Sequence, residues 1–182
     1  MNEIMIDCET LGTGECPVIL TMGAMIFNHH DIVAAKYWRI DLKTCQELGF
    51  QVDERTVLWW QDQSKEAVME VTGGETHIKK ALEELIQFYK KHDCRTVWSN
   101  GAIADIRWLN NGFIKVGLAS PWKFWQERCF RTIRECFPKI KDFKKHGVAH
   151  HALDDARNQV RYLIALRKKY FLDIVQVAKE AV

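Results

Sequence analysis

Hydrophobic and polar positions follow two different periods along the chain, and the first of them predicts strands. An apolar run over residues 4–6 leads into a segment that ends at Thr10, a second apolar run covers residues 18–27, and residues 32–40 alternate loosely between apolar and polar side chains. Short apolar runs separated by polar turns are typical of strands, and residues 28–31 supply one such turn. The N-terminal part is therefore predicted to form an antiparallel meander of three strands.

Helical periods begin beyond residue 53. Asp53 and Thr56 are candidate caps for a short helix over residues 57–60, and Ser64 is a candidate start for another. The clearest helix covers residues 78–89, where apolar side chains recur every three or four positions and charged side chains occupy the opposite face. Its apolar face is predicted to consist of Ile78, Ala81, Leu82, Leu85, Ile86 and Tyr89.

The second half of the chain alternates predicted strands and helices. The pattern predicts strands over residues 96–99 and 122–125, helices over residues 103–110 and 132–137, a basic loop over residues 139–147, a long helix from about residue 151 through Leu166, and a weak helix over residues 172–181. The strand over 96–99 follows a helix, which favours a parallel pairing with the first strand. Strands followed by alternating helices and strands indicate an α/β fold with a mixed central sheet flanked by helices, in one domain spanning residues 1–182.

Composition agrees with a folded domain that has its own core. The chain has 182 residues, of which 47% are hydrophobic, enough to bury a core without disulfides. The sequence has no apolar stretch long enough to cross a bilayer and no signal-peptide pattern near Met1, so we expect a cytoplasmic protein that does not associate with membranes. Its six cysteines form no C-x-x-C pair and are expected to be reduced.

The net charge of +2 conceals an uneven distribution. Residues 115–169 contain 14 Lys and Arg against 5 Asp and Glu, whereas the rest of the chain contains 12 against 19. A concentrated positive charge is expected on a surface that meets phosphate groups, although a solvated helix face gives the same count.

Carboxylates recur where the predicted strands end and the predicted helices begin. Asp7 and Glu9 are two residues apart and therefore share one face of the first strand, Asp105 lies in the first turns of a predicted helix, and Asp155 lies in the first turns of the long one. Ligand sites in open α/β sheets form at such positions. A lone D-x-E pair is a weak signal, but four convergent carboxylates suit Mg²⁺ or Mn²⁺, and two such ions can clamp a phosphoryl displacement.

A base for such a reaction is available five residues before Asp155. His150 is predicted to lie on the loop that enters the long helix, which places a group of near-neutral pKa beside the carboxylates. His151 is the alternative base, but the spacing favours His150, and His151 is expected to point outward or to cap the helix.

Three segments carry a resemblance to a known family. Motifs I, II and III of the DnaQ-like DEDDh 3'-5' exonucleases resemble residues 6–10 (IDCET), 98–105 (WSNGAIAD) and 150–156 (HHALDDA), respectively. Residues 56–60 and 123–128 extend the similarity toward the subgroup of phage DexA-type exodeoxyribonucleases, exonuclease VIII and the exoribonuclease RNase AS. One departure is Cys129, where the subgroup usually has an aspartate.

The resemblance implies an RNase H-like fold and a hydrolytic activity. It implies that Asp7, Glu9, Asp105 and Asp155 hold two Mg²⁺ or Mn²⁺ ions and that His150 is the general base. A water deprotonated toward His150 would attack the phosphorus of the 3'-terminal nucleotide and release a 5'-mononucleotide. The partner is then the 3' end of a nucleic acid; the phage-type likeness favours single-stranded DNA, RNA is the alternative, and a homodimer is left open.

Several further residues are candidates for binding the substrate. They are Thr10, Asn100, Trp59, Trp125, Arg128 and Arg131. Exposed tryptophans can stack nucleobases and arginines can pair with phosphates, but tryptophans more often fill cores and arginines often form surface ion pairs.

Other functions compete with the exonuclease. A non-catalytic nucleic-acid-binding module has no use for clustered carboxylates, whereas a phosphatase or small-oligonucleotide hydrolase shares the same site and differs in substrate length. A zinc site of Cys129, Cys136, His146 and His150 has unfavourable spacing. A nucleophilic thiolate at Cys8 is disfavoured because the flanking carboxylates raise its pKa.

Overall fold

The first strand forms the centre of a mixed five-stranded sheet. In the computed structural model, which describes residues 1–170, the strands are β1 (Asn2–Thr10), β2 (Ile19–Phe27), β3 (Ile32–Arg39), β4 (Cys94–Ser99) and β5 (Glu127–Cys129). Their order in the sheet is β3-β2-β1-β4-β5. The β1–β2 and β2–β3 pairs are antiparallel and the β1–β4 and β4–β5 pairs are parallel. The predicted meander and the parallel pairing are thus confirmed.

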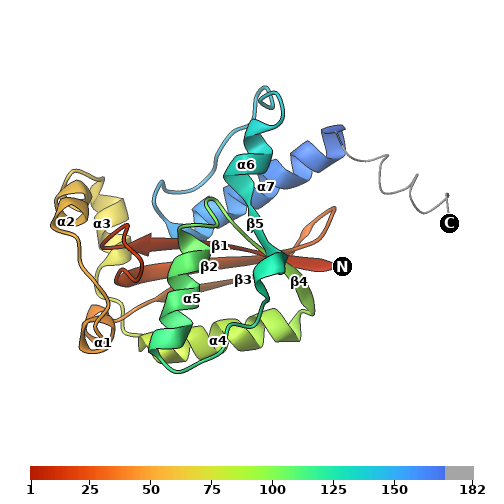
Figure 1. The fold of residues 1–182 in the computed structure, drawn as a ribbon. Coiled ribbons are helices and arrows are strands. Elements are labelled where there is room, and N and C mark those ends of the chain that lie inside the picture. The colour runs from red at the N-terminus through yellow and green to blue at the C-terminus, as the bar shows by residue number, and fades with distance from the viewer. Residues whose placement is uncertain (171–182) are drawn as a thin grey trace.

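The helices cover both faces and one end of this sheet (Figure 1). They are α1 (Leu42–Glu47), α2 (Glu54–Gln61), α3 (Lys65–Val71), α4 (Ile78–Lys91), α5 (Asp105–Lys115), the short 3-10 helix η1 (Phe124–Gln126), α6 (Phe130–Glu135) and α7 (Ala152–Tyr170). Figure 1 shows α1, α2 and α3 at the end of the sheet remote from the N-terminus, where β1 ends. Among the described residues, no helix is long and apolar enough to cross a membrane.

Alternation along β1 separates two cores. Ile4 and Ile6 belong to the larger cluster of buried residues, which includes the apolar faces of α4 and α5. Met5 belongs to the second cluster, which includes Ala156, Val160 and Leu163 of α7. Because side chains alternate along a strand, Asp7 and Glu9 share the face of Met5. The two carboxylates therefore lie on the face of the sheet that α7 covers.

Local side chains explain where several helices begin. The side chain of Asp53 accepts a hydrogen bond from the amide of Arg55 and caps α2, and Ser64 caps α3 by accepting from the amide of Ala67. The apolar period of α4 is confirmed by the burial of Ile78, Ala81, Leu82, Leu85 and Tyr89. Asp41 caps α1, a helix that the apolar pattern does not predict because it has only six residues.

Three predicted elements in the second half of the chain, one strand and two helices, differ from the structure. The predicted strand over residues 122–125 is wrong: Trp122 is buried against Tyr89 and Phe113, residues 124–126 form η1, and the strand follows at β5. The side chain of Gln126 fixes this turn by accepting from the amide of Lys123 and donating to the carbonyl of residue 95.

Two helices also begin at other positions than predicted. α6 covers Phe130–Glu135 in place of residues 132–137, and α5 begins at Asp105 and continues to Lys115. The weak helix predicted over residues 172–181 lies outside the described residues.

The start of α7 approaches the sheet closely at Gly23. A Cβ atom at this position would lie 2.4 Å from the backbone nitrogen of Leu153, so only glycine fits. Gly23 is also the register partner of Asp7 across the β1–β2 pair. The absence of a side chain at Gly23 therefore brings the first turn of α7, with Asp155, next to the carboxylate of Asp7.

The other end of α7 is fixed by a largely buried ion pair. The guanidinium of Arg167 donates to both oxygens of Glu3, over 2.6 Å and 3.0 Å, and Trp98 and Thr96 donate to the same carboxylate. Burial alone would raise the pKa of Glu3, but the hydrogen bonds and charge of Arg167 lower it overall, with help from Trp98 and Thr96.

We expect Arg167→Met to lower the free energy of unfolding by about 3 kcal/mol, because it leaves the Glu3 carboxylate buried with only neutral donors. Urea denaturation measures this difference. Lys168→Met removes an exposed charge from the next position and is expected to change stability by less than about 0.5 kcal/mol. Equal effects of the two substitutions would contradict the assignment of the pair as the anchor of this helix.

Candidate active site

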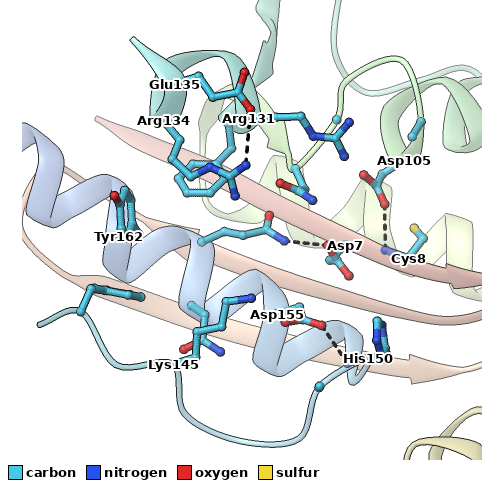
Figure 2. Close-up of a pocket in the computed structure, with 18 of the residues that line it drawn as sticks. Asp7, Cys8, Asp105, Arg131, Arg134, Glu135, Lys145, His150, Asp155 and Tyr162 are labelled. Atoms are coloured by element: carbon cyan, nitrogen blue, oxygen red, sulfur yellow. Dashed lines mark hydrogen bonds and ion pairs between the residues drawn. The ribbon is translucent and has the colours of Figure 1, made fainter. Parts of the chain in front are cut away.

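Five of the predicted site residues lie together in one cleft. Asp7, Glu9, Asp105, His150 and Asp155 all line a cleft of about 1090 Å³. They come from the end of β1, the start of α5, the loop before α7 and its first turn. Figure 2 shows Asp7 between Asp105 and Asp155, with His150 beside Asp155. The convergence expected from strand ends and helix starts is therefore present in the fold.

Backbone amides and one side-chain amide hold the acids in place. The amide of Cys8 donates to Asp105 over 3.1 Å, and the amide of His150 donates to Asp155 over 3.0 Å. Gln159 donates from its side chain to Asp7 over 2.7 Å. Two of these bonds connect β1 to α5 and to α7, and the third lies within the turn that leads into α7.

Sequence reasoning did not identify Gln159. Its signal is the spacing, because it lies four residues after Asp155 and therefore on the same face of α7. Its Oε1 atom is buried without a hydrogen-bond partner among the described residues.

Burial raises the pKa values of three acids, and repulsion from neighbouring carboxylates adds to it for Asp7 and Glu9. The pKa of Glu9 is raised to about 8, first by burial and then by the charges of Asp155 and Asp105. The pKa of Asp105 is raised to about 6 by burial, against the lowering effect of hydrogen bonds such as that from Cys8. Burial, followed by the charges of Asp105 and Glu9, raises the pKa of Asp7 well above its usual range. Such a cluster is unfavourable in its charged form unless a cation lies within it.

The donor set fits a divalent cation. Glu9, His150 and Asp155 each offer one ligand atom, and these atoms lie within 4.8 Å of one another. It is the single group of three or more metal-ligating side chains found within residues 1–170. Carboxylate oxygens are the ligands that Mg²⁺ and Mn²⁺ prefer. Since His150 belongs to this group, its expected role as a base that does not bind metal stays a prediction.

The backbone of His150 is unusual. Its φ of 61° lies in the left-handed region, which is uncommon for residues other than glycine. The imidazole packs edge-to-face against Trp59, with ring centroids 4.9 Å apart. His151 does not enter the cleft; its Nδ1 accepts from the amide of Asp154 and its ring stacks on Tyr37. His151 is therefore a capping residue of α7, as the spacing suggested.

A second cleft of about 550 Å³ adjoins the first at Glu9. Glu9, Cys8 and Trp108 line both clefts, and the second one also contains Thr10, Trp59 and Trp60. Trp59 is 42% exposed, whereas Trp60 is 6% exposed and donates from its indole to the carbonyl of Thr10. Of these two tryptophans, Trp59 is the one whose ring is open to a ligand.

The predicted substrate-binding residues divide into two groups. Asn100 and Arg131 line the larger cleft, and Thr10 and Trp59 line the smaller one. Trp125 and Arg128 line neither of these clefts: Trp125 packs on Phe124, and Arg128 donates to the backbone carbonyls of residues 125 and 127. Both side chains are exposed, and a substrate contact by them stays a prediction.

Neither the Cys8 nucleophile nor the zinc site of Cys129, Cys136, His146 and His150 has support from the geometry, because the one group of metal-ligating side chains found within residues 1–170 is Glu9, His150 and Asp155. Burial, followed by the charges of Asp105, Asp7 and Glu9, raises the pKa of the Cys8 thiol, which opposes formation of a thiolate. Cys129 lies directly before α6, where its thiol donates to the carbonyl of Asn100 over 3.6 Å.

Comparisons with known proteins agree with this geometry. Residues 2–166 match the family of 3'-5' exoribonuclease Rv2179c-like domains. A solved 3'-exonuclease, described for 3'-end specific recognition of a histone mRNA stem-loop, has a TM-score of 0.64 and 14% identity, over 93% of this chain and 82% of that one. The Mg²⁺- and Mn²⁺-bound form of Pop2p from S. pombe has a TM-score of 0.60 and 12% identity, over 92% and 83%. No curated protein sequence matches the chain. The two structures show that the fold is RNase H-like.

In the metal-free protein, we expect stability to fall as the pH rises from about 4.5 to about 8. The folded protein keeps protons on Glu9, Asp105 and Asp7 that the unfolded chain releases near its ordinary pKa values, so rising pH favours unfolding across this window. Thermal unfolding in EDTA at pH 6 and pH 8 measures the effect, and Mn²⁺ is expected to raise Tm more at pH 8. Glu9→Gln should flatten the profile; a Tm that rises with pH would contradict the electrostatic description.

Proposed function

The chain belongs to the family of 3'-5' exoribonuclease Rv2179c-like domains, and from this we propose that it is a divalent-metal-dependent exonuclease that removes 5'-mononucleotides from the 3' end of RNA. The observation that carries the proposal is the convergence of four carboxylates and His150 in one cleft. In our proposal a single exonuclease domain spans residues 1–182.

Each site residue has a role in the proposed reaction. Asp7, Glu9, Asp105 and Asp155 would hold two Mg²⁺ or Mn²⁺ ions, which when bound supply charge neutralisation and Lewis-acid activation for phosphoryl transfer. His150 takes the proton from the attacking water. The 3' oxygen of the penultimate nucleotide is the leaving group, so the terminal nucleotide departs with its 5' phosphate.

The smaller cleft suits the 3'-terminal nucleoside. Trp59 offers an exposed ring on which a base can stack, a contact worth about 1–3 kcal/mol. Thr10, which follows Glu9 at the end of β1, lines the same cleft. The larger cleft, which contains Asn100 and Arg131, is left for the remainder of the strand. This arrangement puts the scissile phosphate near Glu9, where the two clefts meet.

Hydrolysis of a single-stranded RNA with a 5' label, which reports shortening, and of the same RNA with a labelled 3'-terminal nucleotide, which reports mononucleotide release, tests the activity. We expect wild-type protein with Mn²⁺ to release 5'-mononucleotides and to shorten the strand from its 3' end. Asp7→Asn should abolish release, and His150→Gln should lower kcat by about 10²- to 10⁴-fold, the usual contribution of a general base. His151→Gln is the matched control and should lower kcat less than tenfold, because His151 caps the helix outside the cleft. No mononucleotide from the wild type, or full activity of Asp7→Asn, would refute the proposal.

A comparison of DNA and RNA strands of identical sequence tests the substrate. The phage-type resemblance suggests single-stranded DNA, whereas the family is one of exoribonucleases, and we propose RNA on that ground. We expect a higher kcat/KM for the RNA strand, and a 2'-deoxy substitution confined to the two terminal nucleotides should remove most of the difference if the 2'-hydroxyl is recognised at the site. A higher kcat/KM for DNA would overturn this part of the proposal.

A further inference from the structure

Two neighbouring rows of side chains on α7 face two different structures. Asp155 and Gln159 face the carboxylate cluster, where Gln159 donates to Asp7. Asp154, Asn158 and Tyr162 follow the same four-residue spacing and bond to the segment 138–149, which we call the basic strap. One helix therefore supports the acid cluster and the strap together.

The strap is held through its backbone. Asn158 accepts from the amide of His146 over 3.0 Å and donates to the carbonyl of the same residue over 2.8 Å. Tyr162 accepts from the amide of Ile140 over 3.0 Å, and its ring packs edge-to-face on Phe143 at 4.8 Å. Asn158 is only 5% exposed. Both hydrogen-bonding ends of its side chain are thus used to fix the strap at one point.

The strap forms one wall of the larger cleft and places positive charge there. Lys139 and Lys145 line the cleft from the strap, and Arg131 and Arg134 line it from α6. Figure 2 shows Arg131 and Arg134 on one side of the cleft and Lys145 on the other. Arg134 pairs with Glu135 over 3.6 Å, whereas Lys145 pairs with no carboxylate within the described part of the chain. Lys145 is therefore a cation without internal compensation.

We infer that the basic strap binds the phosphates of nucleotides upstream of the scissile bond, with Lys145 as a contact and Asn158 as the residue that positions the strap. This inference rests on the proposed function for the direction of the strand: with the terminal nucleoside in the smaller cleft, the remaining nucleotides leave along the larger one. Because the strap leads directly to His150, Asn158 also fixes the approach of His150 to the carboxylates.

Binding of a labelled single-stranded RNA at several salt concentrations tests the contact. In an Asp7→Asn background, which keeps the RNA intact, Lys145→Ala should make the negative slope of log K against log salt less steep by about 0.7, the value for one phosphate of a single strand. The same slope corresponds to about fivefold weaker binding at 0.1 M salt, if affinities are equal at 1 M. Lys144→Ala removes the same charge from the adjacent exposed position, outside the cleft, and should leave the slope unchanged. Equal slope changes in the two variants would overturn the inference.

Steady-state kinetics test the positioning role of Asn158. Asn158→Ala should raise KM at least as much as Lys145→Ala and should also lower kcat, whereas Lys145→Ala should raise KM alone. Trypsin should cut the freed strap of Asn158→Ala faster than that of the wild type. His146→Ala keeps the backbone groups that Asn158 binds and should match the wild type in KM, kcat and trypsin cleavage. An Asn158→Ala protein with unchanged KM and kcat would overturn the positioning role.

The outcomes separate this inference from the proposed function. RNA binding whose salt dependence changes with Lys145, in a protein that releases no mononucleotide, would refute the exonuclease and support the strap. An active enzyme whose Lys145→Ala and Lys144→Ala variants are indistinguishable would support the exonuclease and refute the role of the strap. Should Asn158→Ala fail to fold, the two lysine variants still decide the inference, because both positions are exposed.

Discussion

The close contact between α7 and β2 at Gly23 decides where the predicted site residues can meet. A side chain at Gly23 would overlap the backbone of residues 152–153, and its partner across the sheet is Asp7. Because the helix can lie directly on the strand there, Asp155 and Gln159 reach the carboxylates of β1. The Arg167–Glu3 pair fixes the other end of the same helix to the first residues of the same strand. Both ends of α7 are thus tied to β1 or its nearest neighbour.

This arrangement gathers like charges in a place where water is scarce. The raised pKa values of Glu9 and Asp105, to about 8 and about 6, record the energetic cost of that gathering. A sequence optimised for stability alone would separate these carboxylates or replace one of them with an amide. A divalent cation would compensate the repulsion among these carboxylates, so the feature that raises their pKa values in the metal-free protein also makes the cleft suitable for the proposed metal ions.

The cleft is asymmetric about Glu9. The smaller cleft contains Trp59, whose ring is open to a ligand, and a single arginine beside one aspartate. The larger cleft contains two arginines of α6 and two lysines of the strap, together with several aromatic side chains. A base and a phosphate backbone need different surfaces, one flat and apolar and the other cationic. In the proposed function, this difference gives a nucleic-acid strand one orientation, with its 3' end at Trp59 and the upstream nucleotides along the cationic walls. The strap would then affect both binding and chemistry, since it carries Lys145 and directly precedes His150.

Much of this could be predicted from the sequence because the responsible signals are local. The period of α4, the caps Asp53 and Ser64, the D-x-E pair and the five-residue spacing of His150 to Asp155 depend on residues close together in the chain. What the sequence did not determine depends on contacts between distant segments. The local pattern predicts that Trp122 belongs to a strand, whereas its contacts with Tyr89 and Phe113, from distant segments, hold it in the core.

The same limit applies to the choice among candidate site residues. Trp59 and Trp125 are both tryptophans next to another aromatic residue in the sequence, so the sequence does not distinguish them. In the structure, Trp59 lines the smaller cleft and Trp125 packs on Phe124. Gln159 and Asn158 are adjacent in sequence, but the helix directs one to Asp7 and the other to the backbone of residue 146. The sequence by itself determined which chemistry the chain carries; the packing of α7, the strap and α2 around β1 decided which side chains share the cleft, because a rotation of about 100° per residue turns neighbours toward different partners.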